Sequence, residues 1–141
     1  MNRIATATLL LLTLAACSDS TSPQESVPGS YVATRLVVTD AGTATDALAA
    51  GATLQLTLDE DGTVSGSIHV PASLADDETE QDNDLVGTWA LNEAGTEVDI
   101  EFTNQEDFVF EDEPWTVAES ALTFSWSGGD NDAVEVTLTK D

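Results

Sequence analysis

The sequence predicts an all-β fold, an antiparallel up-and-down barrel of about eight strands that follows a cleaved signal peptide. Three observations lead to this prediction. Apolar residues beyond residue 30 recur at every second position, which is the period of a strand with one buried face. Turn-forming sequences, such as Asp61-Gly62 and the segment at 92–95, separate these alternating stretches. A short apolar run at residues 4–14 precedes them all.

The first element is the signal peptide, residues 1–16. Arg3 supplies a positive charge before the apolar run, and Ala15 and Ala16 lead into the expected cleavage site before Cys17. The apolar run is shorter than the roughly 20 residues that a membrane-spanning helix needs. The alternatives are an ordinary signal peptide followed by a stray cysteine, and an apolar helix that stays in the membrane.

The sequence Leu14-Ala15-Ala16-Cys17 resembles the lipobox of bacterial lipoproteins. The resemblance implies that a diacylglycerol is attached to the thiol of Cys17 and that cleavage occurs immediately before this residue. Residues 17–29 would then be a lipidated cysteine and a flexible tether, because they are polar and contain proline. We therefore expect a lipid-anchored protein of the bacterial cell envelope on the extracytoplasmic side, in either the inner or the outer membrane.

The barrel domain is expected to comprise residues 30–141. Its Ala-rich segment at 43–50, followed by Gly51, predicts one or two helical turns. Its acidic segment at 75–84 predicts a mobile loop. The alternating segments predict strands at residues 31–39, 52–58, 64–70, 85–91, 96–102, 108–110, 122–126 and 134–138.

Strands that are apolar on one face only must curl or stack to hide that face. A closed barrel pairs each strand with its sequence neighbour and joins the first to the last, whereas a two-sheet sandwich with the same periodicity has Greek-key crossovers. We predict the barrel. The apolar phase predicts as inward side chains Leu54, Leu56, Leu58, Val64, Ile68, Val70, Trp89, Leu91, Val98, Ile100, Phe102, Phe108, Phe110, Leu122, Phe124, Trp126, Val134, Val136 and Leu138.

The charge of the chain is strongly negative. The sequence carries 27 Asp plus Glu against three Lys plus Arg, for a formal net charge of −24. Beyond the signal peptide the basic residues are Arg35 and Lys140. This balance excludes nucleic acid and anionic membrane surfaces as partners held by direct electrostatics. It favours cations or basic partners, or it serves solubility alone, as in salt-adapted proteins of similar composition.

Several segments look like the small lipocalin-like lipoproteins of bacteria. These are Gly29-Ser30-Tyr31 at the start of the first strand, Asp-Gly-Thr-Val-Ser-Gly at 61–66 and Gly-Thr-Trp at 87–89. The resemblance implies an eight-stranded up-and-down barrel on a short lipidated anchor. It also implies a small apolar or amphipathic ligand bound within the barrel.

Two functions compete at this point. The first is a binding protein whose barrel accepts such a ligand; Trp115 lies outside a clear alternation and is the candidate for the barrel mouth. The second is a structural or protein-interaction lipoprotein with a filled barrel. Many inward Leu, Phe and Trp residues favour a filled interior, whereas Gly66 and Gly87 would leave room at one level. The candidate ligand-contacting residues are Trp89, Trp115, Trp126, Phe102 and Phe124.

Catalysis is not expected, and neither is a cofactor. His69 is the single histidine and falls on the polar face of its strand, without a partner at a recognisable spacing. Among metal sites, calcium is the strongest candidate, because Asp59 and Asp61 begin like a calcium-binding loop. The segment does not complete the twelve-residue loop pattern. We expect the protein to be a monomer.

Overall fold

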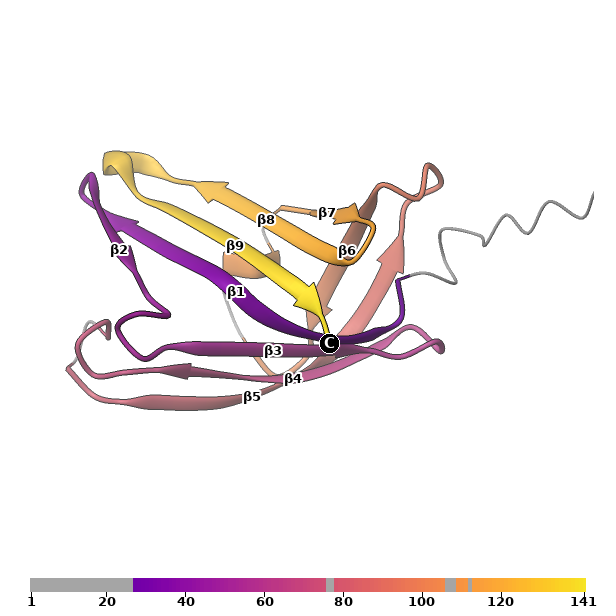
Figure 1. Ribbon diagram of the computed structural model, residues 1–141, viewed down its shortest axis with the longest axis horizontal. Coiled ribbons are helices and arrows are strands. Elements are labelled where there is room, and N and C mark those ends of the chain that lie inside the picture. The colour runs from indigo at the N-terminus through magenta and orange to yellow at the C-terminus, as the bar shows by residue number, and fades with distance from the viewer. Residues whose placement is uncertain (1–26, 76–77, 106–108, 112) are drawn as a thin grey trace, which may run out of the picture.

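The computed structural model describes residues 27–75, 78–105, 109–111 and 113–141 (Figure 1). The predicted signal peptide, Cys17 and most of the tether lie outside these residues, as does Phe108. Within them, no helix is long and apolar enough to cross a membrane. The elements are β1 (Gly29–Asp40), β2 (Thr43–Asp46), β3 (Thr53–Leu58), β4 (Thr63–Val70), β5 (Gln81–Leu91), β6 (Glu97–Phe102), the 3-10 helix η1 (Val109–Glu111), β7 (Trp115–Ala118), β8 (Ala121–Ser127), the 3-10 helix η2 (Gly129–Asn131) and β9 (Ala133–Lys140).

The strands form a closed antiparallel barrel. From β3 to β9 each strand pairs with the next one, and β1 pairs with both β3 and β9, so the sheet has no open edge at this seam. The predicted eight-stranded up-and-down barrel is therefore confirmed. Apart from β2, which pairs with β1 alone, the described strands pair in the order of the sequence, which excludes the two-sheet sandwich.

The first strand is long and serves three neighbours. Along one edge, residues 29–32 pair with β3 and residues 37–40 pair with β2, while β9 runs along the other edge. The register with β9 shifts at Thr34, which forms a bulge. Because of this extra residue, Tyr31 and Leu36 are both buried although they differ in parity.

The helical turns predicted at 43–50 are only partly present. The segment starts as β2, because Ala41 and Gly42 have φ values of 46° and 82° and form a tight hairpin turn with β1. A single turn follows, in which the Asp46 carboxylate accepts a hydrogen bond from the Ala49 N–H (3.1 Å). The hairpin was not predicted because a non-glycine residue with positive φ is uncommon.

The prediction of a strand at residues 108–110 is wrong. Residues 109–111 form η1, and the corresponding strand of the barrel is β7. β7 pairs with only the first two residues of β6. Beside the other end of β6, the Glu111 carboxylate of η1 accepts a hydrogen bond from the Phe102 N–H. Phe110 is buried, so its apolar character reflects a core position in a 3-10 turn.

The acidic loop predicted at 75–84 is shorter than expected. β5 begins at Gln81, and its next residues, including Asp82 and Asp84, continue the ladder with β4. Both aspartates are exposed on the outer face of the barrel. A strand can carry them there without burying a charge.

The predicted interior is largely confirmed. Val70, Leu91, Trp126 and Val134 are partly buried and pack against the core. The other described members of the predicted inward set are buried, namely Leu54, Leu56, Leu58, Val64, Ile68, Trp89, Val98, Ile100, Phe102, Phe110, Leu122, Phe124, Val136 and Leu138.

The core also contains large residues outside that set, including Leu85 and Trp115. Val27 is buried as well, and its carbonyl accepts a hydrogen bond from the Tyr31 hydroxyl. The folded domain therefore begins before residue 30, and the segment available as a tether is shorter than residues 17–29.

Gly66 and Gly87 do not leave room in the barrel. A Cβ added at Gly66 would meet the Gln55 carbonyl and the Leu56 side chain, and one added at Gly87 would meet the Glu101 carbonyl. Both glycines allow neighbouring backbones to approach closely. The free space in the molecule lies elsewhere.

Candidate functional site

A cavity of about 430 Å³ opens at one end of the barrel. The β1–β2 hairpin, η2 and the connection between β4 and β5 all lie at this end, on the left of Figure 1. Three polar residues, Asp40, Thr45 and Ser73, contribute to the lining. The apolar lining consists of Leu36, Val38, Ala47, Ala52, Ile68, Val70, Leu74, Ala75, Val109, Phe110 and Val134.

A packed aromatic group supports one wall of the cavity. Phe110, which lines the cavity, meets Phe124 edge-on with ring centroids 5.3 Å apart. Trp115 lies 5.1 Å from Phe124, measured between ring centroids, and its Nε1–H donates to the Phe110 carbonyl (3.2 Å). Because Phe110 is held by both partners, we expect this wall to be rigid.

The cavity exists because small side chains and a short strand coincide at this end. Ala47 and Ala52 face it from the turn between β2 and β3, where larger residues would fill the space. On the far side β7 stops short, and η1 occupies part of the wall between β6 and β8. The other end of the barrel is closed by buried residues such as Tyr31 and Trp89.

The five aromatic residues predicted to contact a ligand do not line this cavity. Trp115, predicted at the mouth, is fully buried, and Phe102 and Phe124 are also core residues. Trp89 lies under the β3–β4 turn, where its Nε1–H donates to the Asp59 carbonyl (2.9 Å). Trp126 is the cross-strand partner of Val134, which does line the cavity.

The sequence contained two weaker signals for this site. Val38 and Val134 continue the apolar phase of their strands to the open end, where they are only partly buried. They are also cross-strand partners in the β1–β9 seam that closes the barrel. Recognising Val38 required the position of the Thr34 bulge, which the sequence pattern does not show.

The two aspartates predicted to bind calcium form hydrogen bonds within the β3–β4 turn. The Asp61 carboxylate accepts from both the N–H (3.0 Å) and the hydroxyl (2.6 Å) of Thr63. These bonds lower the pKa of Asp61, the hydroxyl contributing most. Gly62 has a φ of 85°, as expected for the Asp-Gly turn. Asp59 and Asp61 are not in the group of three potential metal ligands found among the described residues.

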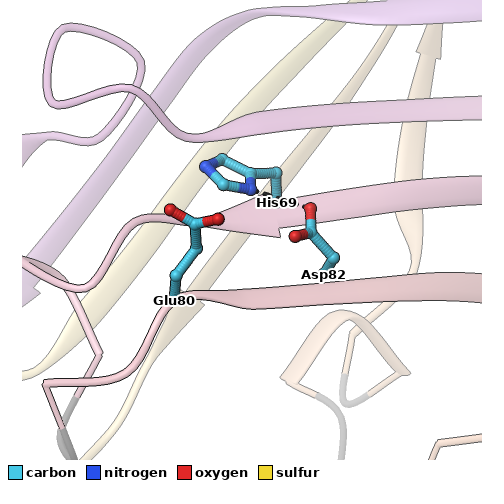
Figure 2. A group of neighbouring side chains, drawn as sticks. All are labelled: His69, Glu80 and Asp82. Carbon is cyan, nitrogen blue, oxygen red and sulfur yellow. Dashed lines mark hydrogen bonds and ion pairs between the residues drawn. The ribbon is translucent and has the colours of Figure 1, made fainter.

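That group consists of His69, Glu80 and Asp82 (Figure 2). His69 lies on β4, Asp82 lies on β5 and Glu80 immediately precedes β5. Their side chains point toward one another, and their potential ligand atoms lie within 4.8 Å of one another. His69 Nδ1 lies 2.8 Å from a carboxylate oxygen of Asp82, its cross-strand neighbour. The group is on the outer face, because Ile68 and Val70 on either side of His69 line the cavity. His69 and Asp82 form a hydrogen-bonded pair.

The fold and the site together define a closed eight-stranded barrel with an apolar cavity at one end. No family model matches the chain, and no curated protein or solved structure was found to be similar to it.

Proposed function

We propose that the barrel is a non-catalytic binding protein that holds a small apolar or amphipathic ligand in the cavity. The cavity itself is the observation that carries this proposal. Its volume of about 430 Å³ lies within the range of roughly 300–1,000 Å³ that is typical of small-molecule sites. Its lining is mostly aliphatic, with few polar groups. The competing proposal, a filled barrel that acts only through its acidic surface, does not account for this space.

We further propose that the barrel is a lipoprotein of the bacterial cell envelope, anchored through Cys17. This part rests on the Leu14-Ala15-Ala16-Cys17 pattern and on the apolar run before it. The resemblance to small lipocalin-like lipoproteins implies an eight-stranded barrel, and the strands form such a barrel. A ligand would lie inside it, in contact with its strands. Two acyl chains on one residue suffice for stable anchoring without any contact between barrel and bilayer.

Filling the cavity tests the binding function. N-phenyl-1-naphthylamine is a neutral probe whose fluorescence rises in an apolar environment, and we expect the protein to bind it. In Val134→Phe the added ring occupies cavity space, so we expect the probe to bind at least about tenfold more weakly. The matched control is Val86→Phe, since Val86 is 51% exposed on the outer face of β5. We expect the control to bind like the original protein.

Two results would count against the proposal. One is the absence of any fluorescence rise with the original protein at probe concentrations below aggregation. The other is probe binding by Val134→Phe that is as strong as binding by Val86→Phe, while each variant keeps its original midpoint of urea unfolding. The first would favour the filled-barrel protein, and the second would place the probe outside the cavity.

A further inference from the structure

We propose that the cavity selects amphiphiles with a cationic head group, accepts neutral ones and rejects carboxylates of the fatty-acid type. This inference rests on the proposed binding function, and it specifies the class of ligand. It follows from the positions of the charged side chains relative to the opening.

Negative charge lies on the β1 side of the opening. Asp40, the last residue of β1, lines the cavity and is exposed. The hairpin turn that follows it is bound to η2 and the residue after it, because Gly42 N–H donates to the Asn131 carbonyl (3.2 Å) and Ala41 N–H donates to the Asp132 carboxylate (2.9 Å). A head group next to Asp40 therefore also lies near the negative charge of Asp132.

The arginine and lysine side chains of the described chain lie away from this opening. Arg35 lies on the outer face of β1 and binds Glu135 with an N–O distance of 2.7 Å. Lys140 lies at the opposite end of the barrel, where its Nζ is 5.9 Å from the centroid of the Tyr31 ring. No cationic side chain is among the described residues that line the cavity.

These positions determine which head groups the site tolerates. An alkyl chain in the cavity replaces water along apolar walls whatever its head group is. A carboxylate head group would lie beside Asp40 without a counter-ion, whereas an ammonium would face an opposite charge. Because the site is at a surface, we expect a preference of about tenfold for the cation at low ionic strength, decreasing as salt is added.

Displacement of N-phenyl-1-naphthylamine by three twelve-carbon ligands tests the inference at pH 7. We expect dodecylamine to displace the probe at the lowest concentration, dodecanol at a higher one and dodecanoate at about tenfold the concentration of the amine. All measurements stay below the aggregation limits of the ligands. In Asp40→Asn the gap between the half-displacement concentrations of dodecylamine and dodecanoate should narrow. In the control Asp99→Asn, which removes an exposed outward carboxylate of β6, the gap should be unchanged.

The outcomes separate this inference from the function on which it rests. Selection by the charge of Asp40 is wrong if dodecanoate displaces the probe as well as dodecylamine does. It is also wrong if Asp40→Asn and Asp99→Asn narrow the gap equally. In both cases the proposed binding function is unaffected. If the original protein does not bind the probe, the proposed binding function fails. A gap that persists undiminished at 1 M NaCl would also overturn the electrostatic explanation.

Discussion

Asp61 shows how a fully exposed carboxylate acquires a structural role in a turn. Thr63 donates two hydrogen bonds to one oxygen of Asp61, and both favour the charged form. The pKa of Asp61 in the folded protein is therefore lower than its ordinary value. A carboxyl whose pKa is lowered by folding stabilises the protein above its ordinary pKa, and this contribution is lost as the pH falls through the lower, folded value.

Thr63→Val should raise the pKa of Asp61 toward the ordinary value. The substitution removes the hydroxyl donor, the largest cause of the lowered pKa, and leaves the backbone N–H of residue 63 in place. The carboxyl carbon resonance of Asp61, followed by NMR as the pH is lowered, measures this change. Thr123→Val is the control, because Thr123 is exposed on β8, away from this turn. An unchanged titration of Asp61 in Thr63→Val would mean that the Thr63 hydroxyl does not lower the pKa of Asp61.

Among the described glycines, Gly87 of β5 has the closest approach to a neighbouring backbone, that of β6. Gly87 is paired with Phe102, and a Cβ in its place would meet the carbonyl of Glu101 and the backbone of Phe102. These atoms belong to the neighbouring strand rather than to a flexible side chain. Relief of the clash therefore requires the two strands to separate.

Gly87→Ala should destabilise the fold by roughly 1–3 kcal/mol, the usual cost of overpacking. Urea unfolding followed by tryptophan fluorescence provides the measurement. Gly129→Ala is the matched control, because a Cβ at Gly129 has no heavy atom within 4 Å. Equal midpoints for the two variants would contradict the tight contact.

The elements also show which parts of the fold a pattern of alternating residues can predict. Regular strands such as β3 and β6 were predicted because their faces differ sharply in polarity. The interior of β1 was harder to assign, since the bulge at Thr34 shifts the alternation within one strand. β7 is only four residues long, and its Trp115 follows a proline rather than an alternating stretch.

The cavity could not be predicted from the sequence for a related reason. It depends on where strands end and on which loops meet at one end of the barrel. Phe110 and Ala47 reach it from a 3-10 turn and a connecting turn, for which the period of two carries no information. The predicted aromatic residues were identified correctly as mainly interior, but hydrophobicity alone does not separate a packed wall from a cavity lining.

At the scale of the whole molecule, the proposed anchor is tested by location. When it is expressed in a bacterium, the original protein should be found in the membrane fraction with its proposed signal peptide removed. Cys17→Ser removes the thiol that would carry the diacylglycerol, so we expect soluble protein or uncleaved precursor. Ser18→Ala is the control and should behave like the original protein. Cys17→Ser protein that remained in the membrane with a normally processed N-terminus would contradict lipid anchoring.

The direction of β1 gives the whole domain a polarity. Gly29 begins this strand at the closed end of the barrel, and Asp40 ends it at the opening, after about 36 Å of extended chain. A protein held at its N-terminus would thus be attached at one pole and open at the other. A ligand would reach the cavity from the aqueous side, without first passing between the domain and the bilayer.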